Sequence, residues 1–230
     1  MAKRGRSAVD ICGVLRERIL SWNYIPGQRL KEEDLCREFK VSRAPVREAL
    51  NILAAEKLIE KKANAGCRVK TWSMHELDNL YDFRIAIETF AVGAIALSEE
   101  NIAALHAQRD LWRGLSKMNE DDPLDSSGMA KKDEDLHTMI VNLTGNSFLI
   151  EAHRQINERL RFLRTNDITT FERLKDTCQQ HLDILDSLIS GDIESATDSL
   201  KENIYTGKNH VEISVGNVLK NMYLVKATNE

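Results

Sequence analysis

The chain has 230 residues, 42% of them hydrophobic, which is enough for one large or two modest domains with buried cores. Its four cysteines lack CxxC spacing, which argues against a zinc ribbon and against a disulfide framework. No apolar run reaches the roughly 18 residues of a membrane-spanning helix, and the first residues lack a signal-peptide pattern, so we expect a cytoplasmic protein without a membrane partner.

The formal charge of −4 is divided unevenly along the chain. Residues 1–70 hold 16 of the 32 basic side chains and 9 of the 36 acidic ones, which leaves about +7 there and about −11 in the remainder. Because binding to a polyanion depends on the local field, the basic first part can contact nucleic acid despite the negative total.

The first part of the chain contains three helical patterns followed by two short strands. The helices are expected over residues 9–22, 30–39 and 43–56, and the strands over residues 58–62 and 67–70. Pro26-Gly27 is a turn signal after the first helix, and Ser42 is a suitable N-cap for the third. Three helices and a hairpin predict a winged helix-turn-helix.

The third helix has the features of a DNA-reading helix. Arg43 and Arg47 lie four residues apart and therefore share one face. Val46, Leu50 and Leu53 fall on the opposite face, where they can pack. One side of the helix can thus be buried while the other enters a DNA groove.

After Ser73 the strand signals end and helical periodicity dominates. Six amphipathic helices are expected, over residues 74–97, 102–118, 130–143, 147–163, 169–190 and 192–215. Short connections between them imply antiparallel neighbours in a bundle. The predicted fold is mainly α, with a winged helix-turn-helix domain at residues 1–72 and an all-α helical bundle at residues 73–220.

These motifs resemble the GntR family of bacterial transcription regulators. The matching residues are Pro26-Gly27-x-x-Leu30, the run Val41-Ser42-Arg43-Ala44-Pro45-Val46-Arg47-Glu48-Ala49-Leu50, and then Leu53, Glu56, Leu58 and Gly66. The resemblance is to the FadR-like branch, whose C-terminal part is the ligand-sensing FCD domain, and six helices are closer to its shorter VanR-type arrangement. It implies a homodimeric regulator, usually a repressor, that binds an inverted-repeat operator in double-stranded DNA and associates with the nucleoid when bound. It also implies that a small organic acid modulates this binding.

The resemblance also implies which residues contact DNA. They are Ser42, Arg43, Ala44, Pro45 and Arg47 at the start of the third helix, and Asn64, Ala65 and Gly66 at the wing tip. Arginine suits base reading because its planar fork can hold guanine O6 and N7 together. Ala44 departs from the family, where threonine is common, and removes a hydroxyl contact. The alternative is that Arg43 and Arg47 only solvate the helix and pair with Glu48 or Glu56.

In the second domain, Asp133 and His137 match the Asp and His with which FCD domains bind metal on one helix, and His181 matches the next ligand. The resemblance therefore implies a divalent metal, zinc or nickel. The fourth family position is usually histidine but is Asn203 here, which weakens the site because an amide oxygen is a poorer ligand for transition metals. Asn203 could instead hold a water or bind the effector. The alternative is a surface pair of Asp133 and His137, with His181 as a core histidine.

Arg84 matches an arginine that often faces the FCD cavity, where it could hold a carboxylate effector in a bidentate manner. An intrahelical pair of Arg84 with Glu88 is the alternative, and neither is favoured. The remaining histidines are expected at the surface or between helices. A basic stripe of Arg159, Arg161 and Arg164 is expected to be solvated or at an interface.

Two other functions fit parts of the sequence. A helical-bundle metalloenzyme could use the metal ligands, but no acid or base stands out beside them and the Glu-x-x-His pairs of di-iron bundles are absent. An architectural DNA-binding protein would need no effector. We therefore expect no enzyme activity.

Overall fold

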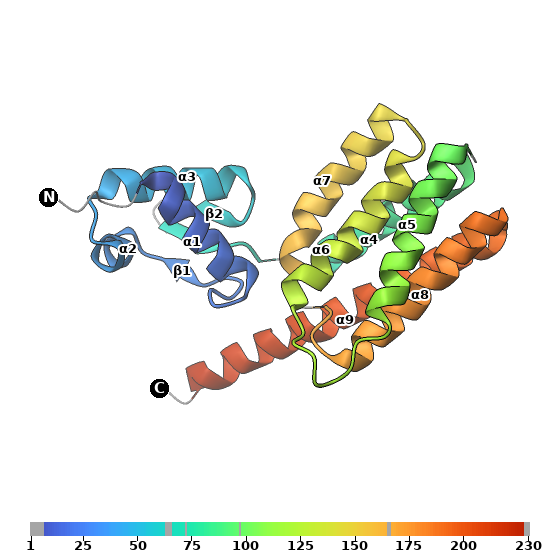
Figure 1. Cartoon of the computed structure of the whole chain (residues 1–230). Coiled ribbons are helices and arrows are strands. Elements are labelled where there is room, and N and C mark those ends of the chain that lie inside the picture. The colour runs from blue at the N-terminus through green and yellow to red at the C-terminus, as the bar shows by residue number, and fades with distance from the viewer. Residues whose placement is uncertain (1–6, 63–65, 72, 97, 165–166, 228–230) are drawn as a thin grey trace, which may run out of the picture. The chain divides into compact units, whose positions relative to one another are not determined.

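The computed structural model describes residues 7–62, 66–71, 73–96, 98–164 and 167–227. The chain divides into two compact units, Met1–Ser73 and Met74–Glu230, which are described separately (Figure 1). None of the helices in the described ranges is long and apolar enough to cross a membrane.

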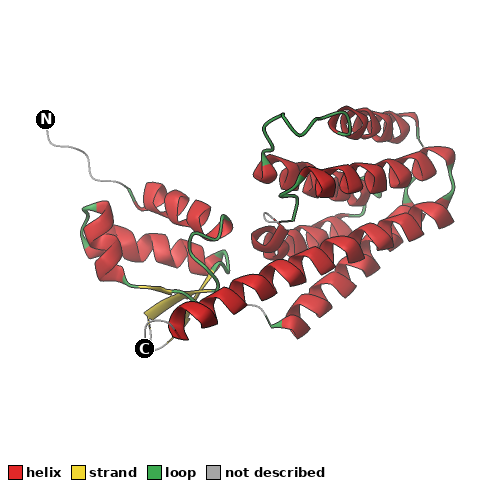
Figure 2. Ribbon diagram, turned by 90° about the horizontal axis from the view of Figure 1, so that it is seen from below, coloured by secondary structure: helices red, strands yellow, loops and turns green. Residues whose placement is uncertain are grey.

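The first unit packs three helices on a small sheet. The helices are α1 (Ala8–Leu20), α2 (Glu32–Phe39) and α3 (Arg43–Ala55), and the strands are β1 (Arg29–Leu30), β2 (Ile59–Lys62) and β3 (Gly66–Val69). Helix α1 packs against α3, and both bury apolar side chains such as Leu15 and Leu50. The sheet is antiparallel with the strand order β1-β3-β2, and Figure 2 draws its strands in yellow. The predicted winged helix-turn-helix is confirmed.

Strand β1 is absent from the sequence prediction, which began the second helix at Leu30. Leu30 is buried and lies opposite Cys67 of β3, and α2 begins only at Glu32. A strand of two residues is too short to produce an alternating pattern, so pairing with β3 alone reveals it.

The second unit contains six helices within the described ranges. They are α4 (Met74–Ala94), α5 (Glu99–Leu115), α6 (Ser126–Asn142), α7 (Ser147–Arg164), α8 (Phe171–Ser190) and α9 (Ile193–Ala227). Helix α4 packs against α6, α7 and α9, while α8 packs against α5 and α9. These contacts produce the predicted all-α bundle, in which Trp112, Leu136 and Leu185 are fully buried.

Capping residues set the helix ends in this bundle. Asp125 is the N-cap of α6 and accepts a hydrogen bond from Gly128 N, so the helix begins at Ser126, four residues before the expected start. Ser98 is the N-cap of α5, and Thr170 is the N-cap of α8. A side-chain acceptor at the N-cap satisfies a backbone N–H that has no partner inside the helix.

The centre of the bundle is polar. The buried charged or polar residues of this unit are Arg84, Glu88, Asp133, Glu134, His137, His153, Asn157, Arg164, Asp167, Arg173, Thr177, His181 and Asn203. Burying charge is costly unless each group is paired, so such a set in a small domain indicates a binding site.

Candidate functional site

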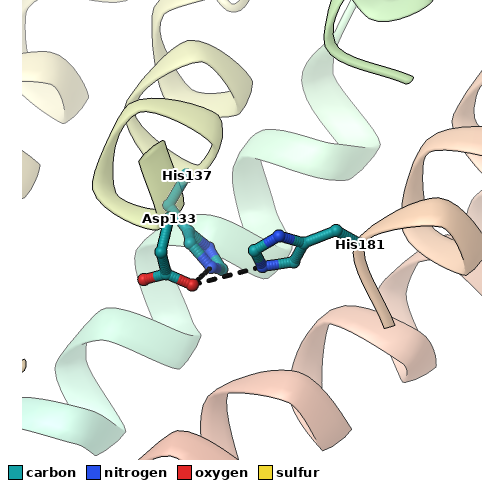
Figure 3. A group of neighbouring side chains, drawn as sticks. All are labelled: Asp133, His137 and His181. Carbon is teal, nitrogen blue, oxygen red and sulfur yellow. Dashed lines mark ion pairs between the residues drawn. The ribbon is translucent and has the colours of Figure 1, made fainter. Parts of the chain in front are cut away.

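Three side chains from two helices meet in the polar centre. Asp133 and His137 lie one turn apart on α6, and His181 extends from α8 towards them (Figure 3). Asp133 Oδ1 is 3.2 Å from His181 Nε2 and 3.7 Å from His137 Nε2. One ligand atom from each residue lies within 4.8 Å of the other two. The structure thus brings the three expected metal ligands together.

Their ring nitrogens are suited to a cation. His137 Nε2 and both ring nitrogens of His181 are buried and make no hydrogen bond within the described residues. Leaving a buried polar atom unpaired costs about 1–3 kcal/mol, which a bound ion would offset. A carboxylate and two imidazoles are donors that zinc and similar divalent metals accept. The residues present therefore fit such an ion.

The electrostatics of Asp133 and His181 suit metal ligands. Burial would lower the pKa of His137, but the carboxylates of Glu88 and Asp133 raise that pKa, so a metal must displace a proton there. Burial would raise the pKa of Asp133, but the imidazoles of His137 and His181 hold that pKa well below its usual range. Burial lowers the pKa of His181 to about 4. Near neutral pH the carboxylate is therefore ionised and the His181 ring is neutral, which are the forms that bind metal.

Glu88 of α4 connects the cluster to the rest of the core. Its Oε2 is 2.6 Å from His137 Nδ1, while its Oε1 is 2.9 Å from His153 Nε2 and 2.7 Å from Arg84 Nε. A carboxylate at Nδ1 makes that nitrogen the donor and leaves Nε2 free to bind an ion, which is the usual arrangement around metal-bound histidines. Sequence reasoning missed this role, because spacing alone indicated only an intrahelical pair with Arg84.

Two buried guanidinium groups lie beside the cluster. Arg84 pairs with Glu88, as one alternative predicted, yet its Nη2 is buried without a hydrogen bond among the described residues. Arg164 is also buried, with Nη1 3.9 Å from Asp133 Oδ2. Burial, and then the nearby charge of Arg84, lowers the pKa of Arg164. The core therefore contains N–H donors available to an anion.

The expectation of a solvated or interface stripe at the end of α7 is wrong for Arg164. Arg159 is exposed, and Arg161 pairs with Glu134 at 2.9 Å, whereas Arg164 turns inward and donates to Asn157. Asn157 in turn donates to His153 Nδ1, so a polar network inside the bundle stabilises the buried position. Helical periodicity shows which face a residue occupies but not which face is covered by neighbouring helices.

Asn203 lies on α9 and is buried. Its Nδ2 donates to Gln180 Oε1 at 3.0 Å, and Gln180 precedes His181 on α8. A side-chain hydrogen bond therefore connects Asn203, the residue at the fourth family position, to the helix that carries His181.

The start of α3 in the first unit is exposed. Ser42 is the N-cap, and its hydroxyl makes no capping bond within the described residues. Arg43 pairs with Glu33 at 2.9 Å and Arg47 with Glu32 at 2.8 Å, both across to the first turn of α2. The alternative reading expected ion pairs of these arginines with Glu48 or Glu56, and those partners are wrong.

Glu48 is exposed, and Glu56, the other expected partner, pairs instead with Arg16 of α1. Ala44 is exposed and Pro45 is half-buried at the same helix end. Gly66 is exposed and has a φ of 77°, a conformation that favours glycine. The expected wing-tip residues Asn64 and Ala65 lie outside the described residues.

Both units match known families. Residues 8–69 match the family described as bacterial regulatory proteins of the gntR family, and residues 79–206 match the FCD domain. The chain is 34% identical over 167 residues to the Nta operon transcriptional regulator of Aminobacter aminovorans, covering 72% of this chain and 75% of that relative. It is 28% identical over 203 residues to the HTH-type transcriptional repressor GlaR of Escherichia coli K12, covering 84% and 90%.

A solved structure supports the fold. Lar, which controls expression of the Listeria monocytogenes agr system, superposes with a TM-score of 0.66 at 20% identity, covering 91% of this chain and 98% of that one. The family matches are to regulators and give no support to the metalloenzyme alternative. The chain belongs to the GntR family of bacterial regulatory proteins and is a DNA-binding transcriptional regulator with an FCD domain, not an enzyme.

Proposed function

We propose that the protein is a homodimeric repressor whose operator binding is modulated by a small carboxylate bound in the second unit. Residues 1–72 bind double-stranded DNA, and residues 73–220 bind the effector and dimerise. The observation that carries the proposal is the set of buried, unpaired polar atoms beside Asp133. We further propose a cytoplasmic location, with the protein at the nucleoid while bound to DNA.

In this proposal, Arg43 and Arg47 read bases in the major groove, and each bidentate contact to guanine contributes about 1–3 kcal/mol of discrimination. The exposed Ser42 hydroxyl and the N-terminus of α3 bind phosphate. Ala44 and Pro45 line the groove edge. Asn64, Ala65 and Gly66 contact DNA as well.

Asp133, His137 and His181 hold a divalent ion in the second unit, zinc or nickel by the nature of the donors. When bound, the ion would supply positive charge that attracts a carboxylate. The buried donors of Arg84 and Arg164 hold the same anion from the protein side. Asn203 serves as a further polar contact, and its amide weakens the metal site relative to a fourth histidine.

The proposed dimer contact involves α4 and α7. Phe83 and Phe90 are one heptad apart on α4 and are 52% and 61% exposed, and Phe148 of the adjacent α7 is 87% exposed. Large aromatic side chains on neighbouring helices are typical of protein interfaces. A two-fold dimer would present two copies of α3 to an inverted repeat.

The test is fluorescence anisotropy on a duplex selected by the wild-type protein from a random pool, titrated with and without a panel of small carboxylates plus zinc or nickel. We expect selective binding that Arg43→Ala weakens by about 1–3 kcal/mol and that one carboxylate weakens in the wild-type protein. A weakening of about 100-fold corresponds to about 2.7 kcal/mol of coupling between the sites. Arg84→Met should still bind DNA but lose the carboxylate response.

The matched control for Arg84→Met is Arg113→Met, because Arg113 is a half-exposed arginine of α5 that pairs only with Asp110 among the described residues. This control should retain both DNA binding and the response. Absence of sequence selection by the wild-type protein would contradict the proposed DNA readout. A response that survives in Arg84→Met would contradict the proposed effector contact. A reporter gene behind the selected duplex distinguishes repression from activation.

A further inference from the structure

The arginines proposed to read DNA already have partners in the free chain. Glu33 Oε1 lies 2.9 Å from Arg43 Nη2, and Glu32 Oε2 lies 2.8 Å from Arg47 Nε. Both acids belong to the first turn of α2, and both arginines belong to the first half of α3. A glutamate of α2 thus neutralises the charge of each of these two arginines.

These pairs are weak enough to open. The side chains of Arg43 and Glu33 are 62% and 74% exposed, and those of Arg47 and Glu32 are 60% and 35% exposed. Exposed ion pairs contribute little to stability because water and salt screen them. A suitable contact on DNA can therefore replace either pair.

We propose that Glu32 and Glu33 are specificity-determining residues that suppress binding to non-specific DNA. This inference rests on the proposed role of Arg43 and Arg47 in DNA binding. On arbitrary DNA an arginine would exchange a carboxylate for a phosphate, which gains little, and the released carboxylate would lie near the anionic backbone. At the selected sequence, guanine O6 and N7 form two directional bonds that offset the loss of the pair.

The effect should be visible in salt dependence. Non-specific affinity follows the number of phosphates that cationic side chains neutralise, and the logarithmic salt slope steepens by about 0.9 for each additional one. Replacing Glu32 and Glu33 frees two arginines for phosphate. We expect non-specific affinity to rise roughly twofold to fivefold for each pair removed, with a smaller rise for the selected duplex.

The experiment measures anisotropy of a short duplex of arbitrary sequence, and of the selected duplex, over a salt series with Glu32→Gln, Glu33→Gln and the double variant. Glu38→Gln is the matched control, because Glu38 lies on the same helix and pairs with Arg18 of α1 rather than with α3. It makes the same change in net charge. We expect Glu38→Gln to leave the ratio of specific to non-specific affinity unchanged.

A second comparison tests the pair itself. Glu33→Gln is introduced into an Arg43→Ala background, where its gain in non-specific affinity should disappear. A gain that persists without Arg43, or an equal gain from Glu38→Gln, would overturn the inference. A loss of binding to the selected duplex alone would also overturn it, since the acids would then position the arginines instead of restraining them. Failure of the wild-type protein to select any sequence would instead overturn the proposed function, so the two failures are distinguishable.

Discussion

Glu88 organises the polar core with a single carboxylate. It contacts Arg84 on its own helix, His137 on α6 and His153 on α7. Burial would raise the pKa of Glu88, but Arg84, His137 and His153 hold it well below its usual range. Removing one partner from such a buried group typically costs several kcal/mol, because a charge is left without compensation.

We predict that Glu88→Gln lowers zinc or nickel affinity by about 10- to 100-fold, because His137 loses the carboxylate that fixes its ring. Trp112 provides the readout, since its ring lies 4.1 Å from that of His181 in an edge-on contact. A metal titration would follow Trp112 emission in a background where Trp22 and Trp72 are replaced by phenylalanine. Circular dichroism would establish that each variant is folded.

Asp186→Asn is the matched control for that titration, because Asp186 is an exposed acid on α8 that pairs with Arg109. It should leave the metal affinity unchanged. Equal affinities for a folded Glu88→Gln variant and the wild-type protein would contradict the role of Glu88.

The sequence predicted the residues of the metal cluster better than the residues around it. Asp133 and His137 are one turn apart on a single helix, but all three residues were identified as metal ligands through the family resemblance. The burial of Arg164 and the three contacts of Glu88 depend instead on how the helices pack against one another. Local spacing carries no information on that packing, and metal binding itself stays a prediction.

At the scale of elements, periodicity located the helices while caps determined their ends. Helix α6 begins at Ser126 because Asp125 accepts from Gly128 N, whereas the amphipathic pattern alone suggested a later start. Helix α9 continues to Ala227, well past the expected end near residue 215. Strand β1 could not be predicted because its only signal is pairing with β3.

The turn between α2 and α3 contains a residue in an unfavourable conformation. Lys40, the C-cap after α2, has a φ of 56° and a ψ of 47°, in the left-handed region that costs a non-glycine residue about 1–2 kcal/mol. We predict that Lys40→Gly stabilises the first unit by about 0.5–1 kcal/mol, because glycine avoids the strain but loses more chain entropy on folding. Urea denaturation of the first unit measures this change.

Lys40→Ala is the control, because alanine removes the lysine side chain but keeps the Cβ that is strained in the left-handed conformation. It should give little or no stabilisation. A destabilised Lys40→Gly variant would contradict the prediction, because it would show that the Lys40 side chain stabilises the fold by more than its backbone strain destabilises it.

At the scale of the whole molecule, the uneven distribution of charge already indicated which part of the chain binds DNA. The basic residues concentrate in the part that contains the winged helix-turn-helix, and the acidic excess lies in the bundle. The sequence could not show that Arg43 and Arg47 are paired with Glu33 and Glu32, because those partners are 10 and 15 residues away and meet only through the fold of α2 against α3. The net field of the reading surface is therefore a property of the fold as well as of composition.

The proposed sensor site depends on a divalent ion held by Asp133, His137 and His181 in the polar core of the bundle. Elemental mass spectrometry of the purified protein, compared with His137→Ala, His181→Ala and the Asp186→Asn control after moderate dialysis, tests it most directly. We expect near-stoichiometric zinc or nickel in the wild-type protein and the control, and its loss in both histidine variants. Metal-free wild-type protein after growth and dialysis with supplemented metal would contradict it.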